Sequence, residues 1–337
     1  MGYVEDDSGR CAVVGYGSWA TAIVKTLTTN GRHVGWHILN DTVLDSLRRD
    51  GRNARYLPYV SIDRSLISPS KDIDEVVAQA STVILATPSA FLKDVMAPLT
   101  APLAGKTVVS AVKGIIPGDN YMTVAEYVHS RYGVPFGQLG VMTGPSHAEE
   151  VGIGRLSYLT VACTDSGRAH AVGEMIANDY IRCSYSDDVL GVEYAAILKN
   201  VYAIAVGMAV GMGYGDNFLA VLIANCAREM TRYLDCKLPN EERNTAAAAY
   251  LGDLLVTCYS PLSRNRRLGN LIGRGCSVKS ALNEMTMVAE GYYAAECVRH
   301  TGMPQGVQMP VADTVYSVLY EGAPAKESIE ALTMKLI

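Results

Sequence analysis

Lys199 is the residue whose type and setting most clearly indicate chemistry. It lies in the sequence AAILKNV (195–201), within an otherwise apolar stretch that has helical periodicity. Burial lowers the pKa of a lysine, and a second cation nearby lowers it further. A lysine with such a pKa can donate and accept a proton near neutral pH, as a general acid or base must. The alternative is a lysine whose aliphatic chain is buried while its ammonium reaches water.

Two other charged residues could act together with this lysine. Lys113 follows an apolar run in the sequence VKG (112–114). This places it at the carboxyl end of an expected strand, where doubly wound sheets bind ligands. The alternative is a solvated surface lysine. Asp253, in LGDL (251–254), is a carboxylate among apolar residues, and it either caps a turn or orients a catalytic group.

Two segments have the composition of anion sites. The sequence SRNRR (263–267) combines hydrogen-bond donors with arginines, whose planar guanidinium groups can bind two phosphate oxygens at once. A basic surface cluster is the alternative. GPSHAEE (144–150) is typical of a loop that opens a helix, a second place for an anion. His147 in this loop ranks below Lys199 as a catalytic acid, because no orienting partner is evident.

A glycine-containing turn near the N-terminus indicates a dinucleotide site. The sequence GYGSWA (15–20) follows an apolar run and precedes a helical pattern. Gly15 permits the tight turn, Gly17 lets the backbone approach a pyrophosphate, and the helix N-terminus offers free N–H groups. An acidic residue that ended the second strand would indicate NAD, but Asp41 lies about one residue too late, and no arginine marks a 2′-phosphate. The cofactor is therefore expected to be NAD or NADP.

These residues require two kinds of supporting structure. Short apolar runs alternate with helical patterns in the first half, which is typical of a parallel sheet. We expect strands at 11–14, 33–38, 82–86, 107–110, 139–142 and 158–163, with a helix at 18–30. After about residue 188 helical periodicity dominates, with helices expected at 190–212, 218–235, 245–257 and 278–301. The predicted fold is an α/β Rossmann-type doubly wound domain (1–188) followed by an all-α, substrate-binding domain (189–337).

Composition excludes several other classes of protein. The chain has 337 residues, a net charge of −5 and no basic block, which argues against a nucleic-acid partner. Its eight cysteines are scattered without metal-ligand spacing, so we expect no metal site and a reducing, cytoplasmic location. The acidic N-terminal segment is not typical of a signal peptide. The uncharged stretch 201–215 is too short for a membrane span and is expected to be a core helix. Size and hydrophobicity favour a homodimer.

Taken together, the motifs resemble the bacterial NAD(P)-dependent glycerol-3-phosphate dehydrogenase family. The resemblance extends from about residue 12 to residue 321. It rests on seven short sequences in the same order: GYGSWATA (15–22), KG (113–114), GPSHAE (144–149), LKN (198–200), GDL (252–254), SRNRR (263–267) and EGY (290–292).

The resemblance implies an activity and a role for each matching residue. The implied reaction is the reversible, NAD(P)H-dependent reduction of dihydroxyacetone phosphate to sn-glycerol 3-phosphate, which supplies phospholipid synthesis. Lys199 matches the general acid/base. The implied substrate contacts are Lys113, Gly144, Ser146, Lys199, Asp253, Ser263, Arg264 and Asn265. The implied cofactor contacts are Gly15, Gly17, Ser18, Trp19, Lys113, Ala148, Arg264, Val288 and Glu290.

The chain departs from the family pattern at four positions. Ala20 stands where the family commonly has glycine, and Leu39 stands where an arginine or histidine often ends the second strand. Leu219 replaces a basic residue, and Asn225 replaces an arginine. These changes put substrate affinity and cofactor preference in doubt more than the type of reaction.

Two other functions fit parts of the pattern. β-Hydroxyacid dehydrogenases and ketopantoate reductases also combine a Rossmann domain with a catalytic lysine on a long helix. Their substrates are carboxylates, whereas the cluster at 263–267 suits a phosphate dianion. A nucleotide sensor without catalytic activity is the second alternative, although a sensor has no need of a buried general acid.

Overall fold

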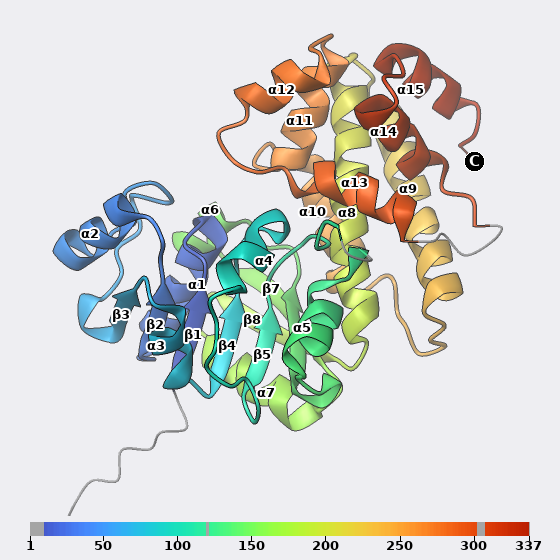
Figure 1. The fold of residues 1–337 in the computed structure, drawn as a ribbon. Coiled ribbons are helices and arrows are strands. Elements are labelled where there is room, and N and C mark those ends of the chain that lie inside the picture. The colour runs from blue at the N-terminus through green and yellow to red at the C-terminus, as the bar shows by residue number, and fades with distance from the viewer. Residues whose placement is uncertain (1–9, 119–120, 302–306, 337) are drawn as a thin grey trace, which may run out of the picture. The chain divides into compact units, whose positions relative to one another are not determined.

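The computed structural model describes residues 10–118, 121–301 and 307–336, and the N-terminal segment judged unlike a signal peptide therefore lies almost wholly outside it. The chain divides into two compact units, whose elements are labelled in Figure 1. Unit 1 comprises the chain up to Val112 together with Val124–Met142 and Ser146–Val189. Unit 2 comprises Lys113–Thr123, Thr143–Pro145 and the chain from Leu190 onward. Two short segments from the first half of the sequence thus belong to the second unit.

Unit 1 is built on an eight-stranded sheet with the order β3-β2-β1-β4-β5-β6-β7-β8. The strands are β1 (Cys11–Val14), β2 (Val34–His37), β3 (Ile67–Ser70), β4 (Thr82–Leu85), β5 (Thr107–Ser110), β6 (Leu139–Thr143), β7 (Ser157–Cys163) and β8 (Ile181–Ser186). Pairing is parallel from β3 through β6 and between β7 and β8. Chain order reverses between β1 and β4, which is the topological switch point of a doubly wound sheet.

The six predicted strands are confirmed, but β3 and β8 were missed. Both are edge strands, and neither carries a continuous apolar run: their sequences are ISPS and IRCSYS. An edge strand is only partly covered, so it needs fewer apolar residues and tolerates proline. The apolar-run criterion therefore detects the inner strands of the sheet better than its edges.

Helices cover the sheet on both faces, as Figure 1 shows. They are α1 (Ser18–Thr29), α2 (Asp41–Asp50), α3 (Ile73–Ala78), α4 (Ser89–Met96), α5 (Val124–Tyr132), α6 (Ala148–Gly152) and α7 (Ser166–Ile176). Helix α1 packs against α6 and α7, whereas α3 packs against strands β1 to β3. The buried side chains between helices and sheet include Leu27, Trp36 and Ile38. The predicted doubly wound domain is confirmed.

From Leu190 onward, the elements that the structure describes in unit 2 are helical. They are α8 (Val189–Gly211), α9 (Asp216–Lys237), the π-helical turn η5 (Ala248–Gly252), α10 (Asp253–Tyr259), α11 (Arg264–Gly273), α12 (Val278–Glu284), α13 (Glu290–His300), α14 (Pro310–Tyr320) and α15 (Ala325–Thr333). By length and composition α8 could cross a membrane, but 94% of its apolar window is buried inside the protein. It forms the core helix expected from the sequence.

Two predicted helices in this unit were wrong in extent. The one expected at 245–257 is a π-helical turn followed by α10, so that a new helix begins at Asp253. The one expected at 278–301 is interrupted after Glu284, and α13 begins at Glu290. The interruption allows Gly291 to lie against the backbone of α8: a Cβ there would come within 2.4 Å of the Asn200 carbonyl oxygen. Tertiary contact overrides the local helical pattern.

Helices α8 and α11 cross at four glycines. Gly207 and Gly211 lie one turn apart on α8, and Gly269 and Gly273 lie one turn apart on α11. A Cβ at Gly269 would come within 2.0 Å of the Ile204 carbonyl oxygen, and each of the other three would meet backbone at 2.2–2.4 Å. The backbones are therefore in direct contact, and this contact holds the start of α11 near the middle of α8.

We expect Gly269→Ala to lower the free energy of unfolding by about 3 kcal/mol, because the added methyl meets backbone that no rotamer change can move. Gly215→Ala is the matched control, since a Cβ at Gly215 has no neighbour within 4 Å and its φ is −84°. Urea denaturation of both variants measures the effect. Equal stability of the two variants would contradict the close crossing of the helices.

Candidate active site

A buried Lys–Asp pair lies within unit 2. Lys199, on α8, donates hydrogen bonds from Nζ to Asp253 Oδ1 at 2.6 Å and to Thr257 Oγ1 at 2.9 Å. Asp253 begins α10 and Thr257 lies one turn later, so both side chains face the same lysine. Only 4% of the Lys199 side chain is exposed. Lys199 is thus fully buried, and its ammonium does not reach the surface as the alternative interpretation required.

The second oxygen of Asp253 is bound by residues from the first half of the chain. Lys113 Nζ lies 3.2 Å from Asp253 Oδ2 and also donates to the Gly144 carbonyl at 3.1 Å. Thr143 donates to the same Oδ2 at 3.0 Å. The Lys113 side chain is 18% exposed, against 1% for Asp253. Lys113 therefore lies at the solvent side of the cluster and Lys199 at its buried side.

Burial and charge together set the protonation of this cluster. Burial lowers the pKa of Lys199 to about 7; Asp253 opposes this shift, and the Lys113 charge adds to it. Burial alone would raise the pKa of Asp253, but the two lysines and the hydrogen bonds from Lys199 and Thr143 hold it below its ordinary value. The carboxylate stays ionised near neutral pH while Lys199 can gain or lose a proton. This is the behaviour that general acid/base catalysis requires.

A chain of side-chain amides fixes the position of Lys113. Asn200 Nδ2 donates to the Lys113 carbonyl at 2.7 Å, and Asn265 Nδ2 donates to Asn200 Oδ1 at 2.8 Å. Asn265 Oδ1 accepts from the Gly291 N–H at 2.9 Å. Helices α8, α11 and α13 are thereby linked to the segment that carries Lys113. The buried amide of Asn265 supports the site whether or not it also contacts a substrate.

The other residues of the 263–267 sequence differ in their position on α11 and in their exposure. Ser263 is the N-cap of α11, where its hydroxyl accepts from the Arg266 N–H at 3.3 Å. Arg264, half-buried, is the first residue of that helix, at the end whose dipole favours anions. Arg267 is exposed and lies 3.7 Å from Glu284. Ser263 and Arg264 therefore lie at the N-terminus of α11, and their contact with a substrate stays a prediction.

The structure brings together five of the residues expected from the sequence, either directly or through Asn200. They are Lys113, Gly144, Lys199, Asp253 and Asn265. Val288 lies in the segment before α13 and Glu290 is its first residue. Ser146 and Ala148 belong to unit 1. The expected contacts of these four residues with substrate or cofactor stay predictions.

Three partners of the cluster were missed in the sequence. Thr143 precedes Gly144, Thr257 follows Asp253 by one helical turn, and Asn200 follows Lys199 directly. The spacing of Asp253 and Thr257 was a usable signal, because residues four apart share one helix face. The two substituted positions on α9 also have local explanations: Leu219 is buried, and Asn225 donates to the Val221 carbonyl within its own helix. Their effect on substrate affinity stays a prediction.

The turn between β1 and α1 has the geometry of a dinucleotide site. Gly15 has φ of 121°, and a Cβ there would lie 2.7 Å from the Ala86 carbonyl oxygen. A Cβ on Gly17, the N-cap of α1, would have no neighbour within 4 Å, so the turn leaves room above the helix N-terminus. Ser18 and Trp19 form the first turn of α1. The position at the switch point and the open helix N-terminus fit a pyrophosphate.

Two side chains that the sequence analysis missed hold this turn in place. Trp36 Nε1 donates to the Gly15 carbonyl at 2.7 Å. The fully buried Asn53 donates from Nδ2 to the Tyr16 carbonyl at 2.9 Å and to Thr21 Oγ1 at 2.8 Å. The carbonyl groups of the turn are therefore bonded within the protein. Nothing in the local sequence signals this role of Asn53, which follows the turn by more than 30 residues.

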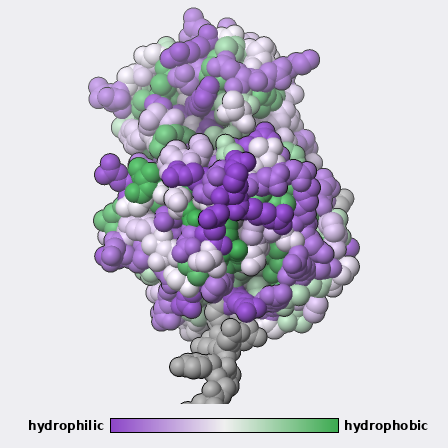
Figure 2. Space-filling model, turned by 90° about the vertical axis from the view of Figure 1, so that its left-hand side faces the viewer, coloured by the Kyte–Doolittle hydropathy of each residue, from purple (hydrophilic) through white to green (hydrophobic). Residues whose placement is uncertain are grey.

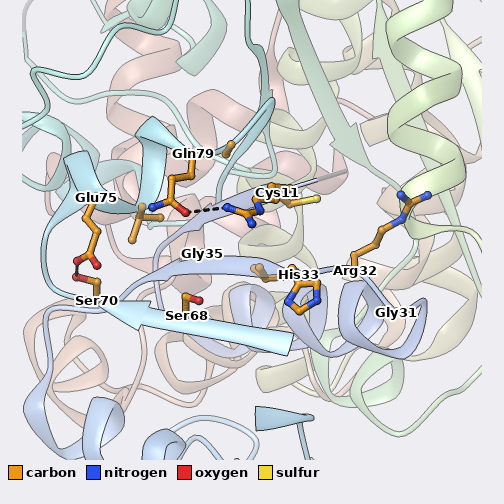
Figure 3. Close-up of a pocket in the computed structure, with 13 residues that line it drawn as sticks. Cys11, Gly31, Arg32, His33, Gly35, Ser68, Ser70, Glu75 and Gln79 are labelled. Atoms are coloured by element: carbon orange, nitrogen blue, oxygen red, sulfur yellow. Dashed lines mark hydrogen bonds between the residues drawn. The ribbon is translucent and has the colours of Figure 1, made fainter. Parts of the chain in front are cut away.

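A separate cavity of about 560 Å³ lies at the other end of these strands (Figure 3). Its lining includes Cys11 and Val34, the first residues of β1 and β2. Polar side chains around it bind one another: Arg10 donates to Gln79 at 3.1 Å, and Ser70 donates to Glu75 at 2.5 Å. Because dinucleotides bind at the carboxyl ends of parallel strands, this cavity is not the cofactor site.

A doubly wound sheet with an open glycine turn at its switch point, together with a helical unit that buries a Lys–Asp–Lys cluster, defines a two-domain, dinucleotide-dependent dehydrogenase. The model for the N-terminus of NAD-dependent glycerol-3-phosphate dehydrogenase matches residues 10–169, and the model for the C-terminus matches residues 188–330. The chain therefore belongs to the NAD-dependent glycerol-3-phosphate dehydrogenase family, a family of oxidoreductases. The resemblance inferred from the sequence motifs is confirmed.

Individual relatives agree with this assignment. Glycerol-3-phosphate dehydrogenase [NAD(P)+] of Staphylococcus carnosus (strain TM300) is 34% identical over 324 residues, covering 96% of this chain and 97% of that protein. The crystal structure of glycerol-3-phosphate dehydrogenase from Coxiella burnetii has a TM-score of 0.89 at 27% identity, covering 97% and 99%. A ketopantoate reductase of Ralstonia eutropha JMP134 has a TM-score of 0.58 at 14% identity, covering 96% and 99%, and so shares only the fold.

Proposed function

We propose that this chain reduces dihydroxyacetone phosphate to sn-glycerol 3-phosphate, reversibly and with NADH or NADPH. The observation that carries the proposal is the buried Lys199, bonded to Asp253 with Lys113 on the other carboxylate oxygen. Family membership supports the substrate and the cofactor, since the relatives are named for both. The low similarity to ketopantoate reductase favours a phosphate over a carboxylate substrate, and the buried general acid argues against a sensor without catalytic activity.

Lys199 is the proposed proton donor. A bound nicotinamide supplies the hydride to the carbonyl carbon of the substrate. Lys199 Nζ donates its proton to the oxygen that becomes the new hydroxyl, and in the oxidative direction it takes the proton back. Asp253 and Thr257 hold the ammonium in place, and the pKa of about 7 lets both protonation states exist near neutral pH. Burial keeps competing water from the lysine.

The substrate phosphate is proposed to bind at the start of α11. Arg264 supplies charge, Ser263 supplies a hydroxyl, and the helix N-terminus adds a positive dipole end. The further substrate contacts are proposed at Lys113, Gly144, Ser146, Asp253 and Asn265. The residues proposed to hold the cofactor are Gly15, Gly17, Ser18, Trp19, Lys113, Ala148, Arg264, Val288 and Glu290.

Arg264→Ala tests this assignment. We expect the KM for dihydroxyacetone phosphate to rise roughly 30- to 100-fold, because a charge-assisted contact is worth about 2–3 kcal/mol. The advantage of dihydroxyacetone phosphate over unphosphorylated dihydroxyacetone should shrink in parallel. Arg267→Ala is the matched control: it removes an exposed arginine from the same helix and should leave KM unchanged. An unchanged KM in the Arg264 variant would contradict the proposed phosphate site.

The proposed reaction also fits a cellular compartment and a use for its product. None of the cysteines in the described ranges forms a disulfide, which fits a reducing compartment, and we place the enzyme in the cytoplasm. There its product would supply phospholipid synthesis. A homodimer is the oligomeric state expected from the sequence, and sedimentation of the purified protein measures it.

A further inference from the structure

The carboxyl end of β2 lies directly beside the dinucleotide turn. The Gly15 N–H donates to the His37 carbonyl at 3.4 Å, and Trp36 Nε1 donates to the Gly15 carbonyl. Beyond His37 the chain pairs once more with β3, through Ile38 N–H to the Ser70 carbonyl at 2.9 Å, and then enters α2 through Leu39 and Asn40. In a Rossmann domain this corner faces the ribose of the adenosine, where NAD carries a 2′-hydroxyl and NADP a 2′-phosphate.

The three residues that lead from β2 into α2 carry no positive charge. Leu39 is apolar and 46% exposed. Asn40 caps α2, and its side-chain oxygen accepts from the Val43 N–H at 3.1 Å. Asp41, the first residue of α2, forms an ion pair with Lys71, which follows β3. Lys71 is therefore paired with the carboxylate beside it, in an ion pair whose two side chains are both exposed.

Two arginines of this edge are bonded to other groups. Arg48 and Arg49 lie in the last turn of α2, where Arg48 donates to the Pro69 carbonyl and Arg49 pairs with Asp50. Arg55 lies two residues beyond Asn53, whose side chain bonds the turn, and the Arg55→Ala variant tests whether this arginine serves a 2′-phosphate. The face of unit 1 with α2 and β3 is turned to the viewer in Figure 2, where hydrophilic side chains are interspersed with apolar ones, and Leu39 is among the exposed large apolar residues.

We infer that this chain selects NADH over NADPH, with Leu39 and the Asp41–Lys71 pair as the determinants of specificity. A 2′-phosphate brings a charge of about −1.5 to −2, which needs cationic partners. Here it would meet an apolar side chain and a carboxylate, with Lys71 already paired. A 2′-hydroxyl brings no charge and tolerates these neighbours. The inference rests on the proposed cofactor site at the turn and names which of its two dinucleotides the site prefers.

Binding of each dinucleotide to the full chain, without substrate, tests the inference. Titrations followed by nicotinamide fluorescence give Kd for NADH and for NADPH. We expect the wild-type protein to bind NADH at least about tenfold more tightly, and Leu39→Arg to tighten NADPH binding about tenfold with little effect on NADH, because an arginine can pair with the phosphate. Leu39→Gln, polar but uncharged, is the control and should not tighten NADPH binding. Asp41→Asn, which frees Lys71, should improve NADPH binding at low salt and less at high salt.

Three results would overturn the inference. They are equal or tighter binding of NADPH by the wild-type protein, loss of that NADPH binding in Arg55→Ala, and no response of NADPH affinity to Leu39→Arg. Binding of neither dinucleotide would overturn the cofactor site itself. A preference for NADH in a protein that does not reduce dihydroxyacetone phosphate would contradict the proposed reaction and leave the preference standing.

Discussion

Lys199→Ala is expected to lower kcat for the reduction of dihydroxyacetone phosphate by a factor of about 10³, within the range that a positioned general acid contributes. The reason is that the described cluster contains no other group so placed: Lys113, the second ammonium, lies on the far carboxylate oxygen of Asp253. Steady-state kinetics measure the loss. Binding of NADH should change little, because Lys199 is not among the residues proposed to hold the cofactor.

Lys199→Arg separates charge from proton donation. An arginine keeps the positive charge beside Asp253, but its pKa stays too high for it to give up a proton near neutral pH. The arginine variant should therefore be nearly as inactive as the alanine variant. Restoration of turnover to Lys199→Ala by a small primary amine in solution would support proton donation by the lysine. Turnover of either variant within threefold of the wild-type value would remove Lys199 from the catalytic role.

Asp253→Asn is expected to lower kcat about 10²-fold, an effect of the size that loss of a buried, hydrogen-bonded carboxylate produces. The carboxylate lies between two lysines and raises the pKa of Lys199 against the effect of burial. Without its negative charge, the two lysines lie close together with no carboxylate between them, and Lys199 loses its proton at a lower pH. Less of the enzyme then carries the proton that reduction needs.

The pKa of Lys199 also predicts the direction in which the rate of each reaction changes with pH. In the wild-type enzyme Lys199 has a pKa of about 7 and must be protonated for reduction, so kcat/KM for reduction should fall as pH rises through 7. Oxidation needs the neutral lysine and should fall as pH drops through the same value. Asp253→Asn should move both inflections to lower pH. Because a phosphate monoester itself titrates near pH 6, unphosphorylated dihydroxyacetone serves as the control substrate. An inflection that does not move would contradict the coupling of the two residues.

The sequence predicted the parts of this site that depend on local pattern. A lysine in an apolar helix, a carboxylate among apolar residues and a glycine turn after the first strand are all local signals, and Lys199 and Asp253 are buried as their settings indicated. For Asp253 the sequence left two interpretations open, a turn cap or an orienting group. Its hydrogen bonds to Lys199 and Thr143 fit the second interpretation, and its role in catalysis stays a prediction.

The parts that the sequence did not predict depend on tertiary contact. Thr143 and Asp253 are 110 residues apart in the chain, and the contact between Asn200 and Asn265 spans 65 residues. The crossing of α8 and α11 at glycines, and the break before α13, likewise need the partner helix to be known. Strands β3 and β8 were missed because an edge strand carries too little apolar sequence. Local periodicity therefore predicts elements, whereas these side-chain partners follow only from the packing of elements.

The most direct test of the central claim is absorbance at the nicotinamide band after the full-length enzyme is mixed with NADH and one substrate. The substrates to compare are dihydroxyacetone phosphate, unphosphorylated dihydroxyacetone and ketopantoate. We predict rapid oxidation of NADH with dihydroxyacetone phosphate, and rates at least about 10²-fold lower with the other two, since only the first offers a phosphate to Arg264. Faster oxidation with ketopantoate, or none with any of the three from folded protein that binds NADH, would contradict the account.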